Sequence, residues 1–212
     1  MNRFYCLIYV LLLVSYHNKA TSQIPSRADS LRSDICFLES SLKTSYPSLY
    51  RYQSRSKMGS LFLAEQNALT DRTTDIQFFG TIKRLLSTLK DGHLYAGAPA
   101  WLDTYLKEKA RLFPLRLYFA DGKAWLQQPF VQFPAATELF EIDGRPIAEV
   151  KKELHRYIVG DGNITTKKDH ILSNIFYFYY FLAYGERPQY QVKLREPGGK
   201  ISTISISAVA EH

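Results

Sequence analysis

The first part of the chain repeats apolar residues every three or four positions, which is the spacing of an amphipathic helix. The third such segment, for example, places Ile76, Phe79, Ile82, Leu86 and Leu89 on one face. The first is expected to stop at Tyr46-Pro47, because proline disfavours helical geometry in the residue before it. Helices are predicted over residues 27–43, 59–69, 75–89 and 101–110. Together they predict a small helical unit over residues 23–110.

From Leu112 onward, apolar and polar positions alternate, which is typical of strands. The alternation runs from Leu115 to Ala120, and Asp121-Gly122 supplies a turn before residues 124–128, so a hairpin is expected. Further strands are predicted over residues 139–142, 189–195 and 201–207, with helices over residues 148–157 and 166–184. Helices first, followed by mixed strands and helices, predict an α+β fold.

The last predicted helix carries two features that can be tested against a structure. Thr166 and Asp169 have the spacing of a capping box, which would open the helix. Residues 175–182 form an almost unbroken aromatic run that could be a membrane or peptide-binding surface. The run is shorter than a membrane span, and tyrosine can bury its ring while its hydroxyl reaches a polar partner. A largely buried helix is therefore the favoured interpretation.

The N-terminus has the pattern of a secretory signal peptide. Asn2-Arg3 is a short basic segment, Phe4 to Tyr16 is apolar, and Ala20-Thr21-Ser22 offers small residues for cleavage before Gln23. The apolar run is too short for a comfortable membrane span, although an uncleaved anchor is the alternative. We therefore expect residues 1–22 to be removed and the protein to be exported, to the periplasm or the extracellular space, without a stable membrane span.

Composition narrows the possible partners. The chain of 212 residues has 27 basic and 20 acidic side chains, and removal of residues 1–22 leaves a net charge of +5. The basic residues are interleaved with acidic ones, as at Lys107-Glu108-Lys109, so no nucleic-acid-binding stripe is expected. Cys36 is the one cysteine left after cleavage. It falls on the apolar side of its predicted helix, where we expect a buried and inert thiol.

The sequence gives little support to most kinds of catalytic site. His93, His155 and His170 lie far apart and form no metal-binding motif, so no metal ligands are predicted. No glycine-rich phosphate loop or dinucleotide fingerprint is present, so no cofactor is predicted either. The chain also lacks a GxSxG nucleophile turn. We expect His155, which lies among basic residues, to face solvent, and we assign no function to His170.

The segment Lys90-Asp91-Gly92-His93 is the most informative short motif. It follows a predicted amphipathic helix, and Gly92 can take a positive φ at little steric cost and so end that helix. His93 would then stand at the edge of a rigid element, where an imidazole can be both oriented and partly wet. The alternative is a helix stop whose imidazole bonds to the core.

The order of these parts resembles the N-terminal half of bacterial tail-specific, or C-terminal-processing, serine peptidases. Two elements carry the resemblance: Leu89 to His93, ending in Asp-Gly-His, and Glu141 to Ile147, which reads Glu-Ile-Asp-Gly-Arg-Pro-Ile. The segment Glu141 to Ile147 is similar to the strand–turn–helix segment of a PDZ-like domain. The resemblance implies a PDZ-like domain over residues 111–208 and the start of a following region at residues 209–212.

The resemblance also implies a function. In the tricorn-like branch of the family, the histidine that matches His93 is the general base of a serine nucleophile carried by a following α/β core. His93 is therefore the candidate catalytic residue, and a peptide or protein is the implied substrate. Because no such core is seen by residue 212, we expect the sequence to be catalytically incomplete. A non-enzymatic exported peptide-binding module, with a groove beside residues 115–119, is the alternative, and a purely structural piece is a third. Oligomeric state stays open.

Overall fold

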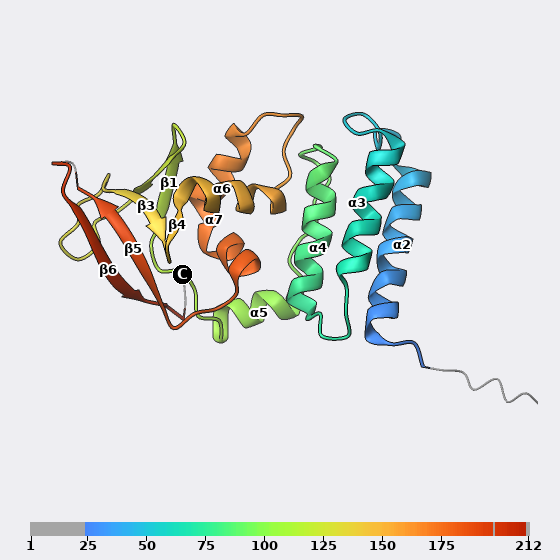
Figure 1. Ribbon diagram of the computed structural model, residues 1–212, viewed down its shortest axis with the longest axis horizontal. Coiled ribbons are helices and arrows are strands. Elements are labelled where there is room, and N and C mark those ends of the chain that lie inside the picture. The colour runs from blue at the N-terminus through green and yellow to red at the C-terminus, as the bar shows by residue number, and fades with distance from the viewer. Residues whose placement is uncertain (1–23, 197, 211–212) are drawn as a thin grey trace, which may run out of the picture.

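The computed structural model describes residues 24–196 and 198–210. The predicted signal peptide, residues 1–22, lies outside the described residues. Helices come first and strands later along the chain (Figure 1). The elements are α2 (Arg27–Ser45), α3 (Arg55–Ala68), α4 (Asp75–Thr88), α5 (Ala100–Glu108), β1 (Leu117–Ala120), β2 (Lys123–Leu126), β3 (Glu138–Ile142), β4 (Arg145–Pro146), α6 (Ile147–Leu154), η1 (His155–Tyr157), α7 (Thr166–Tyr184), β5 (Gln189–Arg195) and β6 (Ile201–Ser207).

The strands form one antiparallel sheet, which confirms the predicted α+β fold. The strand order is β1-β2-β3-β5-β6, and the short β4 pairs with β3. The predicted turn at Asp121-Gly122 joins β1 to β2, and both of its residues have positive φ values. A register shift between Leu139 and Glu141 marks a bulge in β3. One face of the sheet packs on α6 and α7, and the other is open.

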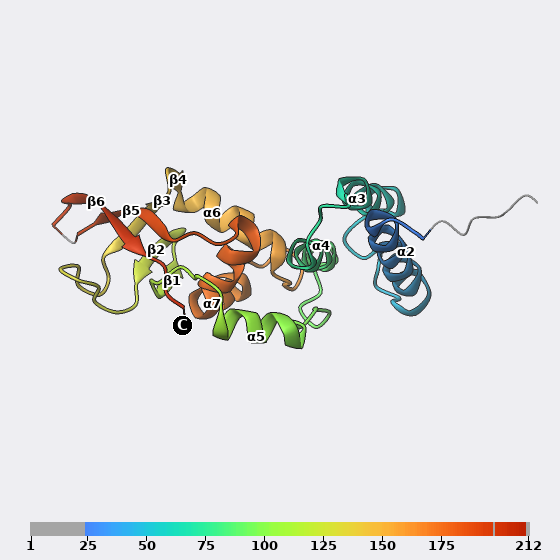
Figure 2. The same cartoon turned by 90° about the horizontal axis from the view of Figure 1, so that it is seen from below.

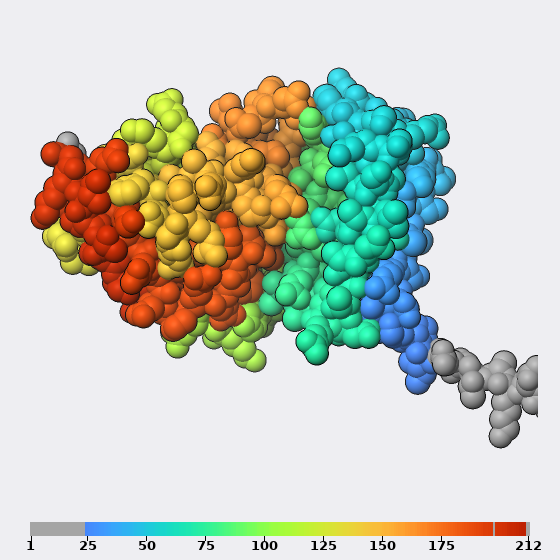
Figure 3. Space-filling model, viewed as in Figure 1, coloured from blue at the N-terminus to red at the C-terminus, as the bar shows by residue number. Residues whose placement is uncertain are grey.

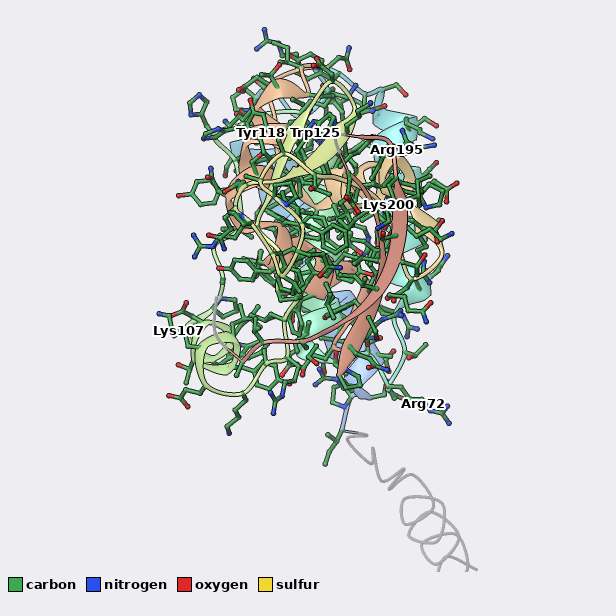
Figure 4. The ribbon with its side chains drawn as sticks, turned by 90° about the vertical axis from the view of Figure 1, so that its left-hand side faces the viewer. Arg72, Lys107, Tyr118, Trp125, Arg195 and Lys200 are labelled. Carbon is green, nitrogen blue, oxygen red and sulfur yellow. The ribbon has the colours of Figure 1, made fainter. Side chains whose placement is uncertain are left out.

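Figure 4 views this open face of the sheet, on which Tyr118 and Trp125 are labelled side by side. These two residues are direct cross-strand partners of β1 and β2. The opposite face carries Leu117, Phe119 and Ala124, all of which are buried. Strand alternation therefore produced one core-facing side and one exposed side, as the sequence pattern predicted.

The aromatic run of α7 lies in the core, as expected. Phe176, Tyr180 and Phe181 are buried, and the Phe176 and Tyr180 rings contact Phe113 at centroid distances of 5.2 and 5.5 Å. The predicted capping box at the start of this helix is wrong. The cap is Thr165, and its side chain makes no capping hydrogen bond. Asp169 does not form a box with Thr166, because its carboxylate bonds to Lys151 and His155 instead.

The helical unit has a separate apolar cluster. Leu31, Ile35 and Leu42 of α2 pack with Met58 and Phe62 of α3. The expectation that Cys36 is buried is wrong, because the thiol is exposed. Cys36 follows Ile35 directly, and one residue along a helix turns the side chain about 100° away from the buried stripe.

Helix α4 lies between the two parts of the molecule (Figure 1). Leu85, Leu86 and Leu89 belong to the apolar cluster of the helical unit, whereas Phe79 belongs to the larger cluster beneath the sheet. The view in Figure 2 shows α2 and α3 on one side of α4, with α6 and α7 on the other. In the space-filling view the helical and strand-rich parts touch, and the segment between α6 and α7 lies against the helices (Figure 3).

Candidate functional site

The motif that contains His93 begins where α4 ends. The helix stops at Thr88, and Leu89 is its cap. The expectation that Gly92 ends the helix with a positive φ is wrong, because Lys90 is the residue in the left-handed region, with a φ of 54°. The chain has therefore already turned two residues before the glycine. What Gly92 supplies is close backbone approach, as its neighbours show.

Gly92 is held against the loop between η1 and α7. Its N–H donates to Asp161 Oδ1 at 2.8 Å, and its carbonyl accepts from Lys167 Nζ at 3.0 Å. A Cβ on Gly92 would lie 2.2 Å from Lys167 Nζ and 2.6 Å from Asp161 Oδ2. The bond from Gly92 lowers the pKa of the Asp161 carboxyl, because a backbone donor favours the ionised form. A side chain at this position would therefore have to push aside the ends of these two flexible side chains.

Lys90 makes the second attachment to the same loop. Its carbonyl accepts from the N–H of Gly162 at 2.9 Å, and its ammonium donates to Asn163 Oδ1 at 2.6 Å. Four hydrogen bonds therefore join residues 90–92 to residues 161–167. The two segments are far apart in sequence, and the sheet-bearing part of the chain supplies one whole side of the contact.

Asp91 attaches the motif to the helical unit. The hydroxyl of Tyr46 donates to Asp91 Oδ2, and the N–H of His93 donates to Asp91 Oδ1 at 2.8 Å. These two donors lower the pKa of Asp91, the tyrosine hydroxyl being the larger cause. Burial, together with the bond to Asp91, raises the pKa of Tyr46 to about 12. Asp91 is therefore an ionised acceptor that fixes the backbone of His93.

His93 itself is exposed, and the next side chain, Leu94, packs against the apolar cluster of the helical unit. The carboxylates of Asp91 and Asp161 lie near the imidazole, which is among the smaller causes of their lowered pKa values. Within the described part of the chain the imidazole makes no hydrogen bond. Its backbone is fixed while its ring faces solvent, an arrangement compatible with proton transfer to an approaching group.

A buried lysine holds the segment that follows His93. Lys83 of α4 donates to the carbonyl of Ala96 at 3.2 Å. Its ammonium lies 5.5 Å from the ring centroid of Phe79 and 5.4 Å from that of Tyr179. Burial lowers the pKa of Lys83 to about 8, because the charged form loses water. The sequence suggested no role for Lys83, since a lysine in an amphipathic helix is ordinarily solvated.

The other two histidines lie elsewhere. The expectation that His155 faces solvent is wrong. Its side chain is 14% exposed, and Nε2 lies 2.9 Å from Asp169 Oδ1. Burial lowers the pKa of His155 despite this partner. The helix end turns the imidazole toward α7, which charge counting along the sequence does not reveal. His170 is exposed on α7 beside Asn174. The structure does not bring His93, His155 and His170 together.

Two other kinds of feature were considered only for the described residues, a metal site and a membrane-spanning helix. No cluster of three or more histidine, cysteine or carboxylate side chains suited to a metal ion occurs among residues 24–196 and 198–210. In the same part of the chain, no helix is long and apolar enough to cross a membrane. Neither finding extends to residues 1–23.

A small groove lies between β1 and α7. It has a volume of about 170 Å³ and lies beside the strand positions that the sequence had suggested for peptide binding. Its floor is apolar, with Leu115, Leu117 and Phe176, and its rim is polar, with Arg116 and Asn174. No residue of the His93 motif is among those that line the groove.

Comparison with known proteins supports the fold. No family model and no curated protein matches the chain. Solved structures of CPAF, a chlamydial serine protease of the tail-specific protease family, are similar to it. A mutant of CPAF gives a TM-score of 0.56 at 15% identity, over 85% of this chain and 34% of that one. Mature CPAF gives 0.53 at 17% identity, over 85% and 34%. Mature CPAF complexed with lactacystin gives 0.53 at 16%, over 85% and 35%.

The chain therefore spans about a third of the length of the CPAF chains that it matches. At this level of identity the likeness is one of fold. The likeness extends over 85% of this chain.

Proposed function

We propose that this chain is the helical and PDZ-like part of an exported serine peptidase that hydrolyses peptide bonds in protein substrates. The fold likeness to part of CPAF supports the family, and the secretory pattern of residues 1–22 supports export. In this proposal the nucleophilic serine belongs to a catalytic core outside the 212 residues, and this chain contributes His93 as the general base.

The observation that carries the proposal is the double attachment of the His93 motif. Tyr46 of the helical unit and Asp161 of the strand-rich part both bond to residues 91 and 92, so both parts fix the backbone beside His93. A general base must be held in one place and still reach the proton it removes. An imidazole that caps a helix end for structural reasons would be expected to bond to the protein, and His93 is exposed instead.

The chemistry follows the usual course of acyl transfer. The His93 imidazole would accept the proton of the serine hydroxyl as the oxygen attacks the peptide carbonyl. The resulting imidazolium would give that proton to the leaving amine as the acyl-enzyme forms. Water would then repeat the two transfers and release the acid. Asp91 would assist in two ways: its carboxylate holds the main-chain N–H of His93, and the negative charge of that carboxylate lies near the imidazolium.

The test begins with the genomic DNA after codon 212. An in-frame continuation that encodes a serine-bearing core would allow the longer protein to be purified and assayed on an unstructured protein such as casein. We expect hydrolysis, and we expect His93→Ala to lower kcat/KM by about 10²- to 10⁴-fold. His170→Ala is the matched control, because His170 is exposed on α7 and should leave the rate unchanged.

Residues 23–212 alone should not cleave the same substrate, because a base without a nucleophile and an oxyanion hole cannot form the acyl-enzyme. Turnover by this segment that disappears in His93→Ala would contradict the proposal that the nucleophile lies outside it. Equal rates for the wild type and His93→Ala in the longer protein would remove His93 from the mechanism.

A second candidate function is a non-enzymatic peptide-binding module. The groove between β1 and α7 favours it, because an edge strand beside a helix is a common place for an extended peptide. Titration with peptides that have a free or an amidated C-terminus would distinguish the candidates. Saturable binding without cleavage supports the module, and absence of any binding supports a purely structural role.

A further inference from the structure

The edge of the sheet at β1 is already occupied by side chains of the same protein. Gln127 N donates to the carbonyl of Arg116 at 3.0 Å, so in the alternating pattern of an antiparallel pair the backbone groups of Leu117 and Phe119 point away from β2. An extended peptide added to β1 would have to bond to these outward groups. Two of them have partners in the structure.

Ser173 of α7 forms a hydrogen bond with one of these outward groups, the N–H of Phe119. Its Oγ accepts from the N–H of Phe119 at 3.0 Å and donates to the carbonyl of Asp169 at 2.9 Å. The hydroxyl therefore supplies the acceptor that the carbonyl of an added strand would supply. Because Asp169 lies one turn earlier on α7, the bond ties the first half of this helix to the edge of the sheet.

Gln127 forms a hydrogen bond with the other outward group, the carbonyl of Leu117. Its Nε2 donates to the carbonyl of Leu117 at 2.8 Å and to the carbonyl of Ser173 at 2.7 Å. The amide thus supplies the donor that an added strand would supply, and it also bonds to α7. Both of its hydrogens are used, so Gln127 bridges the sheet edge and the helix.

The helix is interrupted directly after this contact. Ile175 has φ and ψ values of −137° and 44°, which are not helical, so the first turns of α7 are separate from the buried aromatic half. The bonds of Ser173 and Gln127 all lie before the break, whereas Phe176 and Tyr180 lie after it in the core. Leu172, which also lies before the break, is fully buried in the core, so the contact with the edge of β1 can open only locally, at Ser173 and Gln127.

We propose that Ser173 and Gln127 form a latch that closes β1 to strand addition, and that an extended peptide enters the groove by replacing their hydrogen bonds. This inference rests on the second candidate function above, peptide binding at the same groove. The closed latch also protects an edge strand, which would otherwise be a template for unwanted pairing. Opening corresponds to release of the hydrogen bonds of Ser173 and Gln127 just before the break at Ile175, while the bonds of Lys167 to Gly92 and of Lys151 to Asp169 hold the start of α7 in place.

The test compares Ser173→Ala, Gln127→Met and the double variant with the wild type, using residues 23–212. Gln132→Met and Ser205→Ala are the matched controls, because they change the same residue types at exposed positions outside the groove. The first measurement is hydrogen exchange of the Phe119 amide by NMR. We expect Ser173→Ala to accelerate it about fivefold to tenfold, the effect of losing one hydrogen bond.

The second measurement is the affinity of fluorescein-labelled ten-residue peptides rich in valine and threonine, with free and amidated C-termini. We expect the double variant to bind them about tenfold more tightly than the wild type, because the peptide no longer competes with two internal bonds. The controls should bind like the wild type. If the double variant does not fold, the single variants carry the comparison, with a gain of about threefold each.

The outcomes separate the latch from peptide binding itself. Unchanged exchange of the Phe119 amide in Ser173→Ala overturns the latch, whatever the peptides do. Faster exchange with equal peptide affinity in the wild type and the double variant overturns its role as a gate. Faster exchange with no peptide bound by any variant overturns peptide binding at this groove, and the gate with it. Faster exchange with tighter binding in the variants supports the proposal.

Discussion

At the scale of single residues, the His93 motif depends on a glycine for a reason that differs from the expected one. Gly92 was expected to provide a positive φ, and Lys90 provides it instead. At Gly92, Asp161 and Lys167 instead approach the backbone closely from the other part of the molecule. Its role is therefore a tertiary one, and it can be tested by adding a single methyl group.

We predict that Gly92→Ala slightly lowers the midpoint of urea unfolding, because the new Cβ pushes aside the ends of the Asp161 and Lys167 side chains and with them two exposed hydrogen bonds. Urea unfolding monitored by tryptophan fluorescence would measure the loss. Gly97→Ala is the control, since a Cβ at Gly97 meets no atom within 4 Å and should be neutral or slightly stabilising. Equal effects at both positions would contradict the close approach at Gly92.

Lys83 makes stability depend on pH. Its folded-state pKa of about 8 lies below the usual lysine value, so between these values the unfolded chain binds more protons and the free energy of unfolding rises with pH. We predict that the free energy of unfolding rises by about 1–2 kcal/mol between about pH 7.5 and 9.5. The rings of Phe79 and Tyr179 moderate this rise, because they favour the charged form of Lys83. Urea unfolding at several pH values would measure it.

Lys83→Met should be more stable than the wild type at neutral pH and should lose most of this slope, because it removes the buried charge. Lys57→Met, on the exposed face of α3, is the control and should leave the slope unchanged. Burial raises the pKa of several tyrosines, which opposes the rise near pH 9.5, but it does so equally in the wild type and both variants. A slope that survives in Lys83→Met would assign the effect to another group.

At the scale of elements, the two helix starts with threonine differ in a way the sequence did not reveal. Thr74 and Gln77 form a capping box at α4, with bonds of 3.2 and 2.9 Å between side chains and backbone N–H groups. The box expected at Thr166 and Asp169 does not form, because Asp169 pairs with Lys151 and His155. The same short pattern can therefore cap a helix or serve an ion pair, depending on what packs beside it.

We predict that Thr74→Ala lowers the free energy of unfolding by about 1 kcal/mol, because α4 loses the side-chain acceptor of its cap. Thr165→Ala removes the corresponding residue of α7, whose side chain makes no capping bond, and should cost little. Thermal unfolding followed by circular dichroism would compare the two. A larger loss for Thr165→Ala would contradict this assignment of the caps.

At the scale of the whole molecule, α4 joins two apolar clusters, and one polar contact crosses the same boundary. Arg84 of α4 bonds to Glu65 of α3 through two nitrogens, at 3.0 and 2.5 Å, and to the hydroxyl of Tyr157 at 3.3 Å. The two charged side chains are about 20% exposed. This paired, largely desolvated geometry ties the helical unit to η1 and so stabilises the platform on which the His93 motif is held.

A double-mutant cycle would measure this tie. We predict a coupling energy of about 1–2 kcal/mol between Arg84→Met and Glu65→Gln, because the pair is bidentate and shielded from water. The exposed pair Lys107–Asp103 on α5, at 2.7 Å, is the control, with an expected coupling below about 0.5 kcal/mol. Equal coupling in the two cycles would mean that burial adds nothing to the Arg84 contact.

The sequence by itself determined the local structure. The spacing of apolar residues predicted the helices of the first half, and alternation with the Asp121-Gly122 turn predicted the hairpin, because both signals are short-range. It also singled out His93, and it suggested a groove beside residues 115–119. What it could not supply was the direction of individual side chains, so Cys36 and His155 were placed on the wrong sides of their helices.

Only the tertiary structure decided which distant residues meet. Asp161 and Lys167 reach Gly92 across about 70 positions of sequence, and Ser173 reaches the edge of β1 across 54. No local pattern encodes such contacts, because they arise when two separately patterned parts pack and their remaining polar groups find partners. The fixed backbone of His93 and the closed edge of β1 are both products of that packing.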